Sequence, residues 1–87
     1  MFEPLEPTEF CEKWIPIKRN KKPGEYGYRK QCRKLLAELT GYGETTCNNW
    51  LSTPKEVPQL VRPYLRLVDT LWQIQQILPL EVNNFKQ

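Results

Sequence analysis

The apolar side chains between Tyr26 and Thr40 recur with the period of an α-helix, and this repeat constrains the fold of the chain more than any other feature. When successive residues are placed 100° apart, one arc of ~100° holds five of them: Tyr28, Cys32, Leu35, Leu36 and Leu39. The stretch therefore predicts an amphipathic helix that begins at Glu25 or Tyr26. Gly41 follows it where a C-cap glycine is expected, since glycine readily adopts a left-handed backbone.

Shorter helices are predicted on both sides of this stretch, each bounded by proline or glycine. Residues 8–15 form a short helix with Thr8 as the N-cap, and Pro16 ends it. Gly43 permits the turn before a second short helix over residues 44–51. Residues 53–56 (Thr-Pro-Lys-Glu) match a capping box with proline at the first helical position, and therefore predict a further helical start.

The last predicted helix starts at Pro58 or Pro63, runs to Ile77 and is ended by Pro79. Its apolar side chains cover an arc near ~180°, whereas one packed face needs only about 100°. The residues of this arc are Leu60, Val61, Tyr64, Leu65, Leu67, Val68, Leu71, Trp72 and Ile74, and the polar side holds Arg62, Arg66, Asp69, Gln73 and Gln76. Two explanations remain open: the helix packs on its own core and on a partner, or it is a central helix surrounded by the others.

These segments predict an all-α fold, a small bundle of about four to five helices, because no alternating strand pattern of useful length is present. With 87 residues, the chain has room for one domain over 1–87, with an extended lead-in at 1–7, a basic loop or arm at 18–24 and a C-terminal tail at 80–87. A domain of this size buries only roughly 60–65% of its unfolded surface, so its core is thin. An acidic N-terminus and the lack of a long apolar run lead us to expect a soluble, cytoplasmic protein.

Several kinds of chemistry are disfavoured by composition. The chain has no histidine, which is the commonest general base and metal ligand, and its three cysteines are too far apart for a zinc knuckle. A glycine-rich phosphate loop and a carboxylate pair suited to acid–base work are also missing from the sequence. We therefore expect no enzyme activity, no metal and no cofactor.

The net charge of +3 is distributed very unevenly along the chain. Residues 18–34 hold eight basic side chains and a single acidic one, Glu25, whereas residues 1–17 are acidic overall. A block this basic in an otherwise balanced chain is typical of a surface that binds a polyanion. The alternative is a solvated basic face that lies opposite the acidic N-terminal segment.

A particular spacing of small and apolar residues spans the predicted turn between the two central helices. Ala37 is followed by Gly41 four residues later, by Cys47 six residues after that, and by Trp50 after three more. A small residue allows two helices to cross closely, and the Cys47 and Trp50 side chains must then point back at the first helix. This pattern, over Arg33–Ser52, resembles the helix-turn-helix of the phage repressor and Cro family (XRE-like regulators). It departs from the family at Arg33, often glutamine there, and at Tyr42, usually a small aliphatic residue.

The resemblance implies that the second helix enters the DNA major groove with its N-terminal residues on base edges. The residues at those positions are Gly43, Glu44, Thr45, Asn48 and Asn49, of which asparagine suits adenine, glutamate suits cytosine and threonine suits thymine. This helix has no lysine or arginine, so the affinity for phosphate must come from the basic block. Its cations are Lys18, Arg19, Lys21, Lys22, Arg29, Lys30, Arg33 and Lys34, and the first four form an arm that follows the backbone or enters a minor groove. Neutralising six to eight phosphates gives a log–log salt slope of roughly −5 to −7.

The function predicted is therefore sequence-specific binding of double-stranded DNA by a small transcriptional regulator, which acts as a homodimer through the 58–77 helix. The alternative is a helical protein–protein adaptor whose basic segment binds an acidic partner or RNA, and there Arg62 and Arg66 would matter more than the asparagines. We expect Trp14, Trp50 and Trp72 in the core and Cys32 and Cys47 buried, and leave Cys11 open.

Overall fold

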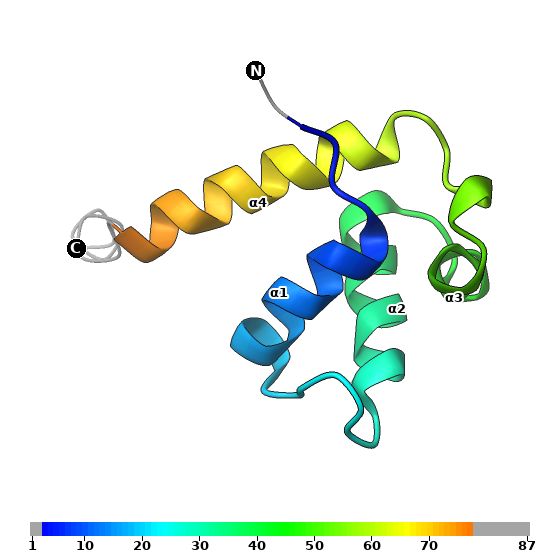
Figure 1. The fold of residues 1–87 in the computed structure, drawn as a ribbon, viewed down its shortest axis with the longest axis horizontal. Helices are drawn as coiled ribbons and strands as arrows, with labels where there is room; N and C mark the ends of the chain where they lie inside the picture. The colour runs from blue at the N-terminus through cyan, green and yellow to red at the C-terminus, as the bar shows by residue number, and fades with distance from the viewer. Residues whose placement is uncertain (1–2, 78–87) are drawn as a thin grey trace.

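A computed structural model describes residues 3–77, and that part of the chain is helical without strands (Figure 1). The order of elements is α1 (Pro7–Arg19), α2 (Tyr28–Thr40), α3 (Glu44–Ser52), the 3-10 turn η1 (Pro54–Glu56) and α4 (Val61–Ile77). The predicted all-α class and small helical bundle are confirmed. The predicted stop at Pro79 and the tail at 80–87 lie outside the described residues.

Helix α1 extends further than predicted at both ends. Glu6, not Thr8, is the N-cap, Pro7 is the first helical residue, and Glu9 Oε1 accepts a hydrogen bond from the Glu6 N–H at 3.2 Å. Pro16 does not end the helix, which continues to Arg19, because the buried residues just before Pro16 hold this segment on the core. The predicted basic loop at 18–24 was therefore placed too early, since the residue that leaves the helix in a left-handed conformation is Asn20 (φ 59°).

The two central helices form close to where the sequence predicts them. Helix α2 begins at Tyr28 rather than at Glu25 or Tyr26, because Gly27 precedes it with φ +87°. It ends at Thr40, and the N–H of Gly41, whose φ is +83°, donates to the Ala37 carbonyl at 2.9 Å. This confirms Gly41 as the C-cap, and α3 matches its predicted range to within one residue at its C-terminal end.

The segment after α3 is less regular than its sequence suggests. Residues 53–56 form only the short turn η1, and Thr53 makes no side-chain capping bond, so the predicted capping box is wrong. Helix α4 then begins at Val61, between the two predicted starts. Pro63 is accommodated in the first turn, where a backbone N–H is not needed for an intrahelical bond.

Helix α1 carries much of the core, since it packs against each of the other three α-helices. Its Trp14 is fully buried, as is Trp50 of α3, while Trp72 of α4 is only half-buried. The Trp72 ring packs edge-on against Trp14, with ring centroids 5.2 Å apart. The predicted core positions of Trp14 and Trp50 are confirmed, that of Trp72 holds in part, and all three cysteines are buried.

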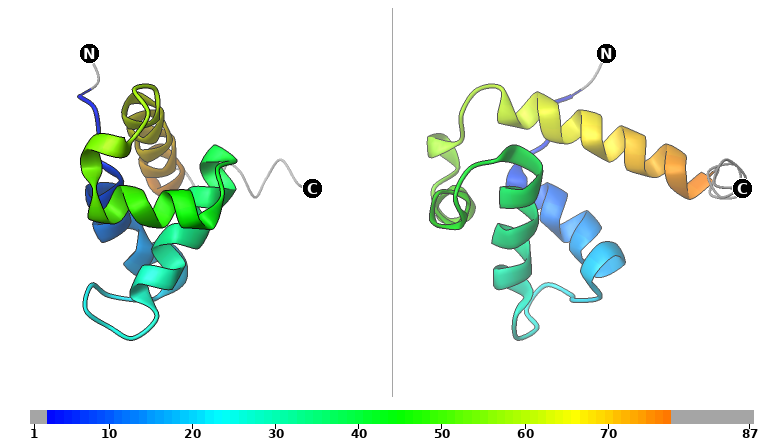
Figure 2. Two further views of the ribbon diagram at one scale, coloured as in Figure 1. Left: turned by 90° about the vertical axis from the view of Figure 1, so that its right-hand side faces the viewer. Right: turned by 180° about the vertical axis from the view of Figure 1, so that it is seen from behind.

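Helix α4 lies along one side of the bundle and projects past it towards its C-terminal end (Figures 1 and 2). Val61, Leu65 and Val68 are buried against the body, whereas Leu67 and Leu71 are 47% and 54% exposed. The explanation of the wide apolar arc as a central, surrounded helix is therefore wrong. None of the helices within residues 3–77 combines the length and apolar character needed to cross a membrane.

Asp69, placed by its sequence position on the polar side of α4, is fully buried. Its Oδ1 accepts from Trp14 Nε1 and Lys13 Nζ, and its Oδ2 accepts from Arg66 and Gln73, all at 2.8 Å. Burial alone raises the pKa of this carboxyl, but the donated hydrogen bonds and the Lys13 charge outweigh burial and hold the pKa below its ordinary value. The bonds from Trp14 and Lys13 hold α4 against α1, whereas those from Arg66 and Gln73 lie within α4.

The acidic N-terminal segment also lies against α4. Arg62 Nε donates to Glu6 Oε2 at 2.7 Å, and Arg66 Nε donates to the Glu3 carbonyl at 2.8 Å. Both arginines lie outside the basic block, so the Glu6 carboxylate pairs with a cation of α4 rather than with that block. Arg62 and Arg66 are committed to contacts within the chain, and reversing their charge would disturb the fold rather than discriminate between partners.

Candidate nucleic-acid interface

Helices α2 and α3 form a compact pair joined by the turn at residues 41–43. Cys47 and Trp50 are buried on the side of α3 that faces the core, as their spacing predicts. Tyr42, the large residue in the turn, packs its ring edge-on against Trp50 with centroids 5.1 Å apart. Because the Tyr42 ring packs against Trp50, the turn accommodates this large side chain.

The predicted base-contacting residues lie at the start of α3 and along its outer side. Gly43, Glu44, Thr45 and Asn49 are exposed, whereas Asn48 is half-buried. Helix α3 lies at one edge of the molecule, where its outer side is uncovered by the other helices (Figure 2). Four of the five predicted residues are therefore accessible to a ligand.

Asn48 is held in place by Arg29, which reaches across from the first turn of α2. Arg29 Nε donates to Asn48 Oδ1 at 2.8 Å, and its Nη2 donates to the Asn48 carbonyl at 3.1 Å and to Ser52 Oγ at 2.5 Å. An amide oxygen has two lone pairs and its nitrogen two N–H groups. Asn48 therefore keeps one lone pair and both donors available while its side chain is fixed in orientation.

A second cation of α2 lies beside the start of α3. Arg33 Nε is 3.5 Å from Glu44 Oε1, and both side chains are partly exposed. An exposed pair of this kind contributes little to stability. Its electrostatic effect is to offset the negative charge that Glu44 places near the N-terminus of α3.

The structure divides the predicted phosphate-binding residues into two groups. Lys18 and Arg19 are engaged within the chain: Lys18 Nζ lies 4.6 Å from the centroid of the Trp72 ring, and Arg19 pairs with Glu38 at 2.7 Å. They therefore do not belong to a free arm. The remaining six lie on the 20–27 loop and on α2: Lys21, Lys22, Arg29, Lys30, Arg33 and Lys34.

The position of two of these cations is unusual for a helix. Arg29 and Lys30 occupy the first turn of α2, where the helix dipole is positive and acidic residues are preferred, and this turn has no acidic residue. Like charges at this end concentrate positive potential beside α3. Both cations are present in the sequence, but their position in the first turn of α2 is recognised only when the helix is known to begin at Tyr28.

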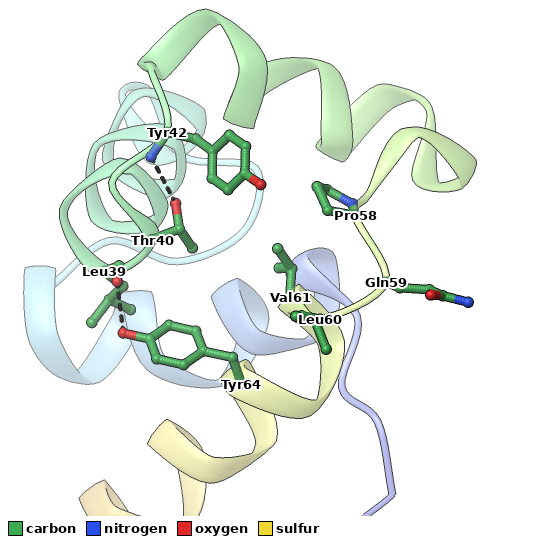
Figure 3. A pocket seen from close by; sticks show the side chains of 8 residues that line it. All are labelled: Leu39, Thr40, Tyr42, Pro58, Gln59, Leu60, Val61 and Tyr64. Atoms are coloured by element: carbon green, nitrogen blue, oxygen red, sulfur yellow. Dashed lines mark hydrogen bonds between the residues drawn. The ribbon is translucent and has the colours of Figure 1, made fainter.

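An apolar groove, which the sequence did not predict, lies between the end of α2 and the start of α4 (Figure 3). It has a volume of about 560 Å³ and is lined by Leu39, Thr40, Tyr42, Pro58, Gln59, Leu60, Val61 and Tyr64. Tyr64 Oη donates to the Leu39 carbonyl at 2.6 Å and so fixes one wall. These residues come from separate parts of the chain, so no local sequence pattern predicts that they line one groove.

Cys11 and Cys32 are hydrogen-bonded to each other in the core. A hydrogen bond with Cys32, together with burial, raises the pKa of the Cys11 thiol, and the same bond lowers the pKa of Cys32. Both cysteines are about 1% exposed, and this burial restricts the access of reagents to their sulfur atoms in the folded state. Within residues 3–77, no group of three potential metal-ligating side chains is gathered in one place.

Comparison with known proteins finds no matching family model, no matching curated protein and no matching solved structure. The function is therefore inferred from the geometry of α2 and α3 and from the charge beside them.

Proposed function

We propose that this chain is a small sequence-specific DNA-binding regulator that places α3 in the major groove, in the manner of the phage repressor and Cro family that residues 33–52 resemble. The observation that carries the proposal is the contact of Arg29 and Arg33 with α3. These contacts hold two cations of the basic block at the edge of the exposed polar residues of α3. Phosphate-binding and base-contacting groups thus lie side by side, as a major-groove binder requires.

Three residues of α3 contact the bases in this proposal, and they do so in two ways. Thr45 and Asn49 project from the exposed side and contact base edges directly. Asn48 presents its free lone pair and donors to a purine, with Arg29 as its positioning residue. Each good base contact contributes about 1–3 kcal/mol of discrimination.

Affinity comes from the cations of the 20–27 loop and α2. Six cations lie on this loop and on α2. Arg29 and Arg33 are counted because their contacts within the chain place them beside the exposed residues of α3, whereas Lys18 and Arg19 contact Trp72 and Glu38 instead. If each neutralises one phosphate, the log–log salt slope is about −5 for each protomer. This value is at the shallow end of the slope expected from the sequence alone.

The regulator acts as a homodimer through α4. The uncovered side of this helix carries Leu67, Leu71 and Ile74, which are between 47% and 54% exposed. A solvated helix presents polar residues on such a side, and an apolar one requires a partner. Two copies give two α3 helices, which suit two half-sites on one duplex.

Two single substitutions test the proposal, one in the base-contacting residues of α3 and one in the phosphate-binding cations of α2. Their expected effects on DNA binding differ. Asn49→Ala removes a base contact but no charge, so it should weaken binding to the preferred duplex by roughly 10-fold to 100-fold and leave the salt slope unchanged. Lys30→Gln removes a phosphate contact, so it should weaken binding to every duplex alike and reduce the slope by about 1 per protomer. Both side chains are exposed, so both variants are expected to fold.

The measurement is fluorescence anisotropy with labelled duplexes, titrated at several salt concentrations. The preferred duplex is first selected from genomic fragments by binding to the protein. Equal loss of affinity from both variants on all duplexes would contradict the assignment of Asn49 to base recognition. A salt slope near zero would contradict phosphate binding by the basic block.

The exposed apolar side of α4 also favours a second candidate function, a helical adaptor that binds a different protein through this surface, with the basic segment on an acidic partner or RNA. The salt slope and the sequence preference separate the two. An adaptor binds duplex DNA without preference for sequence, and Asn49→Ala leaves its binding unchanged.

A further inference from the structure

The exposed apolar residues of α4 and of the residue before it are spaced alternately four and three apart, as in the seam of a coiled coil. This seam consists of Leu60, Tyr64, Leu67, Leu71 and Ile74, which are 40–81% exposed. The charged side chains of α4 in the described part of the chain, Arg62, Arg66 and Asp69, make their contacts with the N-terminal segment, α1 and η1 instead. The seam is therefore free of charge and has the pattern of a helix that pairs with another helix.

The shape of the molecule favours an antiparallel pair. At its N-terminal end the seam is flanked by α2, through the hydrogen bond of Tyr64 with Leu39, whereas the C-terminal end of α4, beyond the contact of Trp72 with α1, extends past the body (Figure 1). Antiparallel pairing places the end of each α4 that α2 flanks against the projecting end of the other α4. With the ends of the two α4 helices aligned, Tyr64 faces Ile74 and Leu67 faces Leu71, so the seam pairs with itself.

In this register the C-terminal end of one α4 lies beside the start of the other. Leu60, which lines the groove (Figure 3), then faces position 78 of the second copy. The sequence continues from there as Leu-Pro-Leu-Glu-Val-Asn-Asn-Phe over residues 78–85, with apolar residues at half of these positions. We propose that the two copies pair through antiparallel α4 helices and that the groove of each copy binds residues 78–85 of the other.

This arrangement rests on the homodimer of the proposed function. It adds to that proposal the relative positions of the two α3 helices. The buried stripe of Val61, Leu65 and Val68 is roughly 100° around α4 from the seam. Both bodies therefore project to the same side of the helix pair, so both α3 helices face the same way. They are separated by at least the length of α4, about 25 Å for 17 residues, which is compatible with half-sites one turn of DNA apart.

Disulfide cross-linking in the full chain tests the pairing without DNA. The variant Leu60→Cys/Leu78→Cys should form a covalent dimer under mild oxidation, detected by mass and by non-reducing electrophoresis. The two positions are separated by the length of α4 within one chain, so an intrachain bond between them is excluded. Leu60 is 81% exposed, and the native cysteines are buried, so the wild-type protein serves as the unreactive control.

The single variants determine the direction of pairing. Leu60→Cys alone and Leu78→Cys alone should stay uncross-linked in an antiparallel pair. Efficient cross-linking of either single variant would indicate parallel helices and overturn the inference, while the homodimer and its DNA binding would stand. A double variant that remains monomeric in light scattering at all concentrations would overturn the pairing itself.

Truncation after Ile77 tests the occupant of the groove. Removing residues 78–87 should raise the dissociation constant of the dimer by at least about tenfold, because apolar contacts in the groove are lost. Gln75→Ala in the full chain is the matched control, since it alters an exposed side chain of α4 outside the seam. An unchanged dissociation constant for the truncated chain would overturn the assignment of 78–85 to the groove.

Discussion

Replacing Asp69 by alanine should destabilise the protein by about 3 kcal/mol. Asp69 is fully buried and accepts four hydrogen bonds at 2.8 Å, one of them from the indole N–H of the fully buried Trp14. Leaving that N–H without an acceptor costs about 1–3 kcal/mol. Breaking a buried charged pair typically costs about 3–5 kcal/mol, but Lys13 and Arg66 are 43% and 25% exposed and recover part of this by hydration.

The assay is urea unfolding followed by circular dichroism at 222 nm, with Gln73→Ala as the matched control. That variant removes one donor to Asp69 from an exposed position and should cost less than about 1 kcal/mol. For a domain of this size, 3 kcal/mol corresponds to a fall of roughly 12–24 °C in Tm. If Asp69→Ala were no more destabilising than Gln73→Ala, the reasoning about the buried carboxylate would be refuted.

The same carboxylate gives the stability a defined dependence on pH. The pKa of Asp69 is held below its ordinary value in the folded protein, so its stabilising effect is complete above the unfolded pKa, about 3.9. It is lost as the pH falls from there through the lower folded pKa. Between pH 5 and pH 2 the wild-type protein should therefore lose more stability than Asp69→Asn, measured by urea unfolding at each pH. Parallel pH curves for the two proteins would contradict the lowered pKa.

Three further substitutions test the packing and the dimer. Gly41→Ala should destabilise the protein by about 1 kcal/mol in urea unfolding, because an alanine is strained at the φ of +83° found there. The added Cβ would meet no atom within 4 Å, so a neutral result would contradict backbone strain as the cause. Ala37→Leu should cost about 1–3 kcal/mol in the same assay by overpacking the crossing of α2 and α3, and no loss would argue against that crossing. Leu67→Asp should give a folded monomer in light scattering with an unchanged helical spectrum, because it places a charge in the apolar seam; a persistent dimer would exclude the seam as the interface.

Helical periodicity made most of the fold predictable from sequence. Helices α2 and α3 depend on local repeats and on Gly41, and these features place them to within a few residues. The ends of α1 could not be predicted in this way, since the continuation past Pro16 depends on burial against other helices. Local preference is overridden there by tertiary packing.

The candidate site was predictable by residue type but not by contact. The basic block and the polar residues of α3 are visible in the sequence, yet the bond between Arg29 and Asn48 joins residues 19 positions apart and requires the folded pair of helices. Asp69 illustrates the same limit. An aspartate among polar neighbours on a helix is expected to be solvated, and its burial depends on donors that α1 brings from 55 residues away.

The ratio of affinities for a selected duplex and for a random duplex of equal length tests the central claim most directly. It is measured for the wild-type protein by anisotropy at one fixed, near-physiological salt concentration. A sequence-specific regulator is predicted to bind the selected duplex about 10³-fold more tightly or better. A ratio near one would contradict the account, since it would mean that α3 does not recognise bases.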